Sequence, residues 1–421
     1  MTALRMSSAT MSIHFTGISA GPAHVVKTAS AGRGTLSYWK KLMKSKICDL
    51  FGIEFPLFAF SHCRDVVVEV SKAGGFGVLG AVGHTPESLE VELDWIDAHI
   101  DGRPYGVDLL VPTSLAGQQD ILTVEEIQAR IPPEHKRHVE QLLASHGIDT
   151  EDLWDIDLAD YYGDSLREEA ASRVMETAFQ HPIKMIINAL GVPPPYMLEQ
   201  AAAHGIPVGA LTGSKEHALK HADAGVDVLI VSGTEAGGHC GEISTLVLVP
   251  EVLETLKTAG FDLPVLAAGG IVTGRQMAAC MTMGAAGAWT GSVWLTTVES
   301  EVTASIREKM IQAGSSQTVR SRSRSGKYTR QLRSGWTDAW VSEDAPEPLP
   351  MPLQGLVTER ALAKIDKLSE SGHAGAKDLA TYLVGQGVGL MNSATSARQV
   401  VYDFMEDFIE AMERACDIMK D

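Results

Sequence analysis

Cysteine is scarce in this sequence, and the thiols that are present form no recognisable framework. The 421-residue chain has five, with no CxxC pair among them: Cys48, Cys63, Cys240, Cys280 and Cys416. An odd number of scattered cysteines argues against a disulfide scaffold and a structural zinc finger, and it is typical of a reducing compartment. We therefore expect a cytoplasmic protein.

Long apolar runs and an excess of positive charge are also absent. No run approaches the roughly 18 apolar residues that a membrane-spanning helix needs. Lysine and arginine number 35 against 53 aspartates and glutamates, which gives a net charge of −18 at pH 7. Because nucleic-acid phosphates and anionic lipids repel such a chain, we expect small-molecule partners, with no nucleic acid and no membrane.

Acidic residues are missing from the chain before Asp49, a region rich in Ser, Ala, Thr and Gly. An organelle transit peptide has this composition, and so does an unselected tail. The apolar segment of a secretory signal, about 7–15 residues long, is not present. We expect residues 1–46 to form a disordered or targeting extension.

The rest of the chain is rich in short apolar runs that alternate with helical patterns. Alternation of this kind predicts an α/β fold with a parallel sheet, and eight units match a closed (β/α)8 TIM barrel, which typically takes about 250 residues. We place this barrel at residues 47–315. The expected strands are Pro56–Phe60, Gly77–Ala81, Tyr105–Val111, Lys184–Ala189, Ile206–Leu211, Asp227–Val231, Pro264–Ala268 and Ala286–Gly291.

Two stretches depart from the alternation. Residues 113–181 are polar with helical spacing, so we expect a helical insertion after the third strand, where barrels carry substrate-shaping elements. Residues 316–421 hold a basic segment at 320–333, a proline-rich linker and helices, and we expect them to pack on the barrel as a helical extension. Their alternating glycines, Gly385, Gly387 and Gly389, are not a GxGxxG motif after a strand and are weak evidence for a dinucleotide site.

The loop after the sixth strand is the strongest candidate for chemistry. It reads SGTEAGGHCG and lies at the carboxyl end of a strand, where α/β folds place their active sites. Gly237 and Gly238 permit close approach of the backbone to a flat ligand. The imidazole of His239 titrates near neutral pH and can exchange a proton.

Two more glycine turns follow the last two strands. Strand seven ends in AAGGI with Gly269 and Gly270, and strand eight ends in WTGS with Gly291 and Ser292. Barrels bind phosphate between these two loops, where backbone N–H groups suit a dianion. The residues alone leave open a non-redox barrel that binds a phosphorylated metabolite.

Four motifs together resemble the nitronate monooxygenase family, formerly the 2-nitropropane dioxygenases: AGGFGVLGA (73–81), GTEAGGHCG (233–241), AAGGI (267–271) and GAWTGS (287–292). These proteins are FMN-dependent TIM barrels related to flavin enoyl-ACP reductases. The resemblance covers roughly residues 47–299 and implies that His239 is the catalytic residue. The residues that it implies for FMN binding are Phe58, Ala59, Asp108, Ser232, Gly237, Gly238, Gly269, Gly270, Gly291 and Ser292.

Three positions depart from the family pattern. Ser232 stands where glutamine is usual, Asp108 where asparagine is usual, and Phe58 where methionine is usual. A carboxylate such as Asp108 near a reduced flavin must be paired or protonated. The resemblance implies an FMN-dependent oxidoreductase that converts alkyl nitronates and O2 into a carbonyl compound and nitrite.

The same motifs fit an NAD(P)H-dependent reductase of an enoyl thioester, an acyl-CoA or acyl-ACP, or of a quinone. The arginines of segment 320–333 bear on this choice, since they either hold the phosphates of CoA or NADPH or form a solvated loop. The expected substrate is therefore a nitronate or an acyl thioester, and the second substrate is O2 or NAD(P)H. The sequence is also compatible with a homo-oligomer. Glu235 and His239 lack a third ligand at a useful spacing, so we expect no metal site.

Overall fold

The computed structural model describes residues 45–111, 129–154, 168–189 and 191–419. The extension expected at residues 1–46, apart from its last two residues, lies outside the described residues. So does a large part of the insertion expected at residues 113–181. None of the helices in the described ranges combines the length and the hydrophobicity that crossing a membrane requires.

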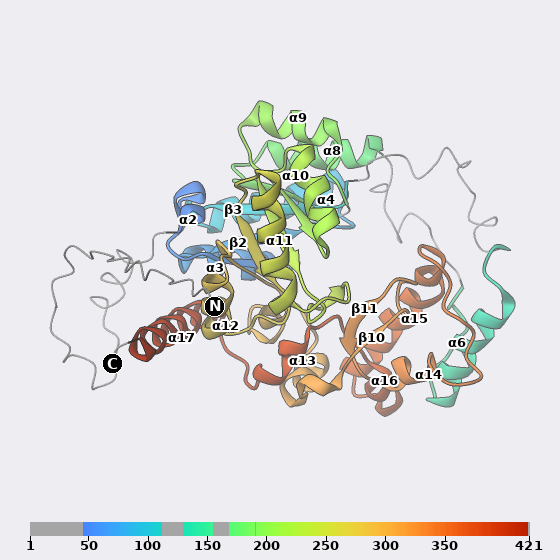
Figure 1. The fold of residues 1–421 in the computed structure, drawn as a ribbon. Helices are drawn as coiled ribbons and strands as arrows, with labels where there is room; N and C mark the ends of the chain where they lie inside the picture. Colours follow the sequence, from blue (N-terminus) through green and yellow to red (C-terminus); the bar gives the residue numbers. More distant parts are fainter. Residues whose placement is uncertain (1–44, 112–128, 155–167, 190, 420–421) are drawn as a thin grey trace, which may run out of the picture. The chain divides into compact units, whose positions relative to one another are not determined.

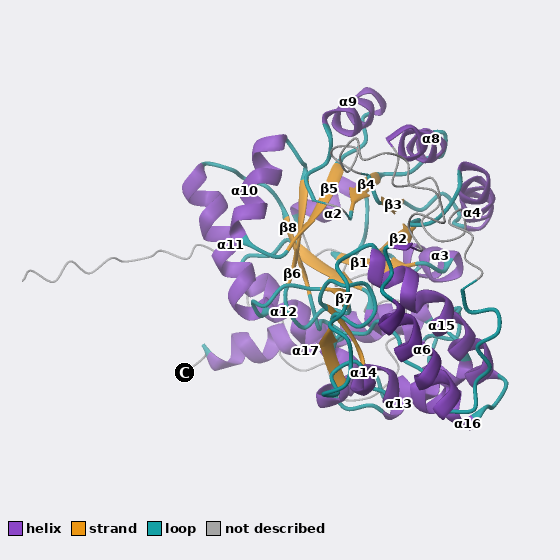
Figure 2. Cartoon of the chain, turned by 90° about the vertical axis from the view of Figure 1, so that its right-hand side faces the viewer, coloured by secondary structure: helices purple, strands orange, loops and turns teal. Residues whose placement is uncertain are grey.

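Eight parallel strands close into a barrel, which confirms the predicted TIM-barrel fold. Each strand pairs with the next, and the last pairs with the first through Phe58 opposite Trp289. Helices surround the strands (Figure 2). The barrel strands are β1 (Leu57–Ser61), β2 (Phe76–Gly80), β3 (Tyr105–Leu109), β4 (Met185–Asn188), β5 (Val208–Thr212), β6 (Val228–Ser232), β8 (Val265–Ala268) and β9 (Gly287–Thr290).

Seven helices follow successive barrel strands, and the eighth comes from the end of the chain. The final helix, α17 (Ala397–Ile418), packs against both α12 and α3 and so fills the eighth position (Figure 1). A Cβ atom at Gly274 of α12 would collide with the backbone of Phe404, so glycine permits this close packing. The other seven are α3 (Arg64–Lys72), α4 (Pro86–His99), α8 (Glu168–Phe179), α9 (Pro195–His204), α10 (Lys215–Ala224), α11 (Thr245–Ala259) and α12 (Gly274–Thr282).

The barrel interior is a packed core that is closed at the amino-terminal ends of the strands. The short helix α2 (Lys46–Phe51) places Phe51 against two inward-facing rings, with centroids 5.6 Å from Phe58 and 5.0 Å from Phe76. All three side chains are nearly or fully buried. A ligand is therefore expected at the opposite end, where the strands end.

Parts of the chain that follow β3 and β9 pack on each other. Helix α6 contacts α15, and the ring of His135 forms a 2.9 Å hydrogen bond with the carbonyl of Glu347. Trp336 and Trp340 are buried in this region. Its helices are α6 (Pro133–Ser145), α13 (Ala304–Gln312), α14 (Gly335–Ala339), α15 (Leu353–Glu370) and α16 (Ala374–Leu379), with the 3-10 turns η2 (Ser292–Thr296), η3 (Ser315–Gln317) and η4 (Gln386–Leu390).

The basic segment is a β-hairpin that continues into the loop of His239. Strands β10 (Thr318–Ser321) and β11 (Thr329–Leu332) pair antiparallel, and β11 pairs in turn with β7 (Gly238–His239). In this register Thr329 lies opposite His239, and Arg330 lies opposite Gly238. The tail therefore supplies one wall of the barrel mouth beside the imidazole.

Candidate active site at the barrel mouth

The parallel register brings the ends of the predicted site strands to one rim. Ser232 pairs with Ala268, so the loops that follow β6 and β8 leave the barrel side by side. On the other side Ala59 pairs with Thr290, directly before Gly291. Asp108 pairs with Gly80 on the strand next to β1. The predicted residues thus lie around one barrel mouth, although at different depths.

Phe58 and Ala59 lie deeper than the resemblance alone implies. Both are fully buried, and the ring of Phe58 packs 4.9 Å from that of Phe76 in the core. Strand β1 continues to Ser61, so Phe60, two residues further on the same face, stands nearer the mouth. The Phe60 and Trp289 rings lie 6.1 Å apart at 28°. These two rings form an apolar surface at the mouth that the sequence motifs did not assign to the cofactor.

Asp108 is a buried carboxyl group without a hydrogen-bonding partner for one of its oxygens. The residue is 3% exposed, and its Oδ1 contacts no donor among the described residues. Desolvation raises the pKa of Asp108 well above its usual value, so the neutral acid is favoured. Asp108 is the next-to-last residue of β3, and its neighbour on β2 is a glycine, Gly80, so its hydroxyl is available to a ligand at the mouth.

His239 lies at the mouth with one ring nitrogen engaged. Its Nε2 is 2.9 Å from the hydroxyl of Ser325, which belongs to the turn between β10 and β11. Desolvation by the surrounding loops lowers the pKa of His239, and the positive charges of Lys327 and Arg324 lower it further. The neutral imidazole therefore prevails at pH 7, with Nδ1 left for exchange of a proton.

The alternating glycines of the tail take part in this site. Gly385 N–H donates to the hydroxyl of Ser292 at 2.8 Å, and Gln386 N–H donates to the carbonyl of Glu235 at 2.9 Å. A Cβ on Gly385 would stand 2.5 Å from that carbonyl, and one on Gly237 would stand 2.8 Å from the backbone of the tail. The sequence alone indicated no role for these tail glycines, because they do not form a GxGxxG motif after a strand.

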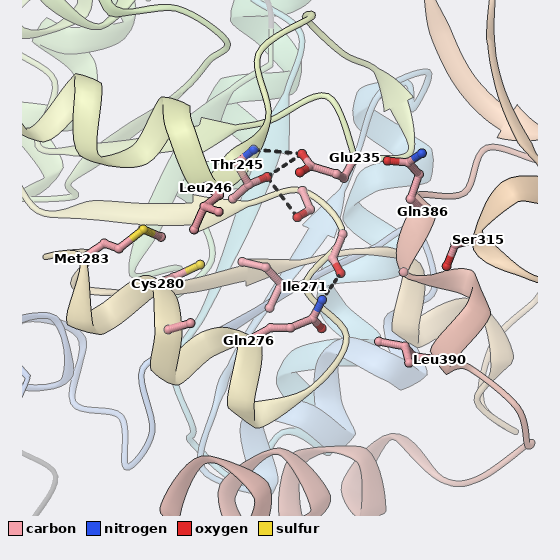
Figure 3. Close-up of a pocket in the computed structure, with 14 residues that line it drawn as sticks. Glu235, Thr245, Leu246, Ile271, Gln276, Cys280, Met283, Ser315, Gln386 and Leu390 are labelled. Atoms are coloured by element: carbon pink, nitrogen blue, oxygen red, sulfur yellow. Dashed lines mark hydrogen bonds between the residues drawn. The ribbon is translucent and has the colours of Figure 1, made fainter. Parts of the chain in front are cut away.

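A cavity of about 340 Å³ opens beside Gly269 and Gly270 (Figure 3). Both glycines have positive φ, 110° and 68°, and a Cβ on either would collide with the neighbouring loops. The carboxylate of Glu235 accepts hydrogen bonds from the N–H and the hydroxyl of Thr245, both at 2.9 Å, and so holds the His239 loop against α11. Gly291 and Ser292 do not line this cavity; Ser292 is bonded to Gly385, the residue before the lining residues Gln386 and Gly387.

The arginines of the basic segment are already engaged within the chain. Arg330 is buried and donates to the carbonyl of Thr234 at 2.8 Å. Lys327 is exposed, and its side chain forms no ion pair with the described residues. The four ion pairs are Arg320–Glu242, Arg322–Glu347, Arg324–Glu359 and Arg333–Asp338.

Comparisons with known proteins agree with this architecture. A family model described as nitronate monooxygenase matches residues 44–407. A Mycobacterium tuberculosis protein named as a monooxygenase is 46% identical over 372 residues, which cover 88% of this chain and 98% of that protein. A Staphylococcus aureus protein named as a nitronate monooxygenase is 24% identical over 332 residues, which cover 75% of this chain and 85% of that protein.

Two solved structures share the barrel fold. Nitroalkane oxidase from Streptomyces ansochromogenes has a TM-score of 0.70 at 22% identity, covering 88% of this chain and 99% of that chain. FabK from Thermotoga maritima has a TM-score of 0.62 at 22% identity, covering 89% and 99%.

Proposed function

The chain belongs to the nitronate monooxygenase family of flavin-dependent oxidoreductases. We propose that it binds FMN and oxidises alkyl nitronates. Molecular oxygen is the electron acceptor, and the products are a carbonyl compound and nitrite. One observation carries the proposal: a neutral His239 lies beside a hairpin whose arginines are engaged within the chain, while the positive charge of Lys327 is unpaired among the described residues.

Three features of the mouth support FMN as the flavin. The unpartnered, buried Asp108 offers a donor to a flavin heteroatom. A Cβ at Gly291 would point into space whose nearest heavy atom belongs to Phe60, 3.9 Å away, so there is room for a ring beside β9. Ser292 accepts from Gly385 and keeps its own O–H for a phosphate. When bound, the flavin supplies the redox chemistry, and the chain supplies position and proton exchange.

His239 acts as the proton-exchanging group in this proposal. Its lowered pKa keeps the ring neutral at pH 7, which is the form that accepts a proton from a nitroalkane or hydrogen-bonds to a nitronate. Lys327 places positive charge near the ring and attracts an anion. Ser325 fixes the ring by its bond to Nε2.

The ion pairs of the basic segment favour a nitronate over an acyl thioester or NADPH. CoA and NADPH present several phosphate charges, which need several free cations. Four arginines of the segment form ion pairs with carboxylates of the chain, and Arg330 is buried against a carbonyl. Lys327 remains, and one lysine suits a substrate with one negative charge.

Anaerobic flavin reduction tests the proposal directly. The FMN-loaded protein is mixed without oxygen with ethylnitronate, with NADPH, or with NADPH and crotonyl-CoA, and the flavin absorbance is followed. We expect bleaching by ethylnitronate alone, and nitrite once oxygen is admitted. Rapid bleaching by NADPH with none by nitronates would assign the protein to the reductases instead. A colourless protein that does not bind added FMN would show that FMN is not its cofactor.

A further inference from the structure

A second cluster of chemically capable side chains lies far from the mouth, at the amino-terminal ends of the strands. His181 follows α8 and its side chain is 6% exposed. Its Nδ1 lies 2.8 Å from Oδ2 of Asp97, and the other oxygen of Asp97 accepts from the Tyr105 hydroxyl at 2.7 Å. Because Asp97 is an acceptor, Nδ1 carries the proton, and the remaining nitrogen, Nε2, turns toward α4.

On α4 this nitrogen meets two carboxylates. Glu90 and Asp94 are four residues apart and share one helix face. The ligand atoms of Glu90, Asp94 and His181 all lie within 4.8 Å of one another. Neither carboxylate forms an ion pair with a lysine or arginine of the described residues. Three groups with lone pairs therefore converge, and a cation between them relieves their repulsion.

The distance between Nε2 and the nearest carboxylate oxygen points to the kind of cation. Nε2 of His181 is 3.3 Å from Oε2 of Glu90, which is long for a charge-assisted hydrogen bond of about 2.7–2.9 Å. Bonds of about 2.0–2.1 Å from a tetrahedral zinc ion place two ligand atoms about 3.3–3.4 Å apart. The Glu90–His181 separation matches one edge of that tetrahedron, and the three ligand atoms, which lie within 4.8 Å of one another, would draw closer around the ion.

We propose that Glu90, Asp94 and His181 bind one Zn²⁺ ion, with Asp97 as the group that orients the imidazole. A histidine ligand whose other N–H is held by a carboxylate is the usual arrangement at protein zinc sites. The partly exposed Glu90 and the exposed Asp94 leave a path for the ion and for a water as fourth ligand. No metal was expected, because Glu235 and His239 lack a third ligand at a useful spacing, and the order of residues along the chain does not show that His181 lies beside α4.

The position of the site assigns it a structural role. Tyr105 begins β3, and His181 shortly precedes β4, so the cluster lies at the end of the barrel opposite to His239. Features at this end of a barrel serve stability rather than chemistry. The ion joins α4 to the segment that returns from the insertion after β3.

Zinc titration of the full chain tests the proposal. The untagged protein is freed of metal with a chelator, and ZnCl2 binding is measured by calorimetry together with Tm. We expect one tight equivalent and a Tm increase of about 3–6 °C. Asp94→Asn and His181→Gln should lose that equivalent, and Asp97→Asn should weaken it about 10–100-fold. Glu92→Gln is the matched control on the same helix, because Glu92 pairs with Arg64 away from the site, and it should bind as the wild type does.

Asp94 is exposed, so the Asp94→Asn protein is expected to fold even if His181→Gln does not. An Asp94→Asn protein that binds zinc with unchanged affinity and shows the same Tm increase would overturn the proposal. So would a wild-type protein that binds no zinc, in which case a proton alone holds His181 between the carboxylates. The His239→Ala protein should still bind one tight equivalent of zinc. If this variant loses that equivalent, zinc binds at the barrel mouth and the proposal is wrong.

Discussion

The hydroxyl of Ser325 lies 2.9 Å from Nε2 of His239, although 86 residues separate them in the chain. The contact exists because β11 pairs with β7, which brings the turn of the hairpin over the imidazole. The proposed catalytic group and the residue that positions it thus come from the barrel loop and from the tail. The tail thus contributes to the proposed active site as much as the barrel does.

Replacing Ser325 with alanine should disturb the position of His239 without removing it. A net hydrogen bond of about 0.5–1.5 kcal/mol corresponds to a loss of about 2–10-fold in kcat/KM. The affinity for FMN should stay unchanged, and Ser325→Thr should restore most of the rate because it keeps the hydroxyl. Steady-state nitrite formation measures this, with Ser342→Ala, an exposed serine bonded to Ala339, as control. Equal rates in the Ser325→Ala and wild-type proteins would mean that the contact does not position the ring.

The imidazole itself should matter far more. His239→Ala removes the proton-exchanging group, and we expect a loss of about 10²–10⁴-fold in turnover of nitroalkanes with retention of the flavin colour. The visible flavin spectrum and the rate together separate a catalytic from a structural role. A colourless His239→Ala protein would show that His239 holds the cofactor instead.

The acid side of the pH profile should report the charge of Lys327. Neutral His239 is the active form, so kcat/KM should fall as the pH decreases through the lowered pKa of His239. Lys327→Ala removes one of the positive charges that lower this pKa, so the pKa rises and the acid limb moves to higher pH. Lys364→Ala, whose lysine pairs with Asp149 elsewhere, should leave the limb in place. A limb that moves to lower pH in Lys327→Ala would contradict the assignment of the limb to His239.

The strands were predictable because each is a short apolar run between turn residues. The run at Asp227–Val231 became β6 at Val228–Ser232, and eight such runs sufficed for the barrel. The helical pattern at the end of the chain also became α17. Its place as the eighth barrel helix was not predictable, because the contact between Gly274 and Phe404 leaves no periodic signal in either segment.

The sequence predicted which loops form the site. It did not predict how deep each side chain lies in the barrel, or which residues of the tail contact those loops. The motifs indicated the mouth, yet only the register shows that Phe60, rather than the side chain of Phe58, stands near it. Strand β7 has two residues, too few for any alternation, so its pairing with the basic hairpin had no sequence signature. The role of Gly385 depends on the same kind of long-range contact.

Gly385→Ala tests whether the tail belongs to the cofactor site. The added Cβ would stand 2.5 Å from the carbonyl of Glu235 and 3.3 Å from the Ser292 hydroxyl, so the loops must separate. Overpacking costs about 1–3 kcal/mol, and we expect the Kd for FMN to rise by about tenfold or more. Gly314→Ala is the control, since its Cβ would have no neighbour closer than 3.8 Å. Fluorescence titration of the apoprotein with FMN measures both. Equal affinities for FMN in the two variants would show that Gly385 and the tail do not contribute to the cofactor site.

Asp108→Asn should stabilise the apoprotein at neutral pH by removing a carboxyl that resists ionisation. The folded pKa is raised above the unfolded value near 3.8, so the folded state binds more protons and wild-type stability falls as the pH rises above about 4. The variant lacks this loss, so its stability advantage over the wild type should grow as the pH rises toward 7 and should shrink toward pH 4. Urea unfolding of the two apoproteins at several pH values measures the difference. Since asparagine keeps a donor at this position, FMN should still bind to the variant, and its affinity should decline less at high pH than that of the wild type. Stability curves that stay parallel from pH 4 to pH 8 would show that Asp108 ionises freely. The proposal that protonated Asp108 donates a hydrogen bond to the flavin would then be wrong.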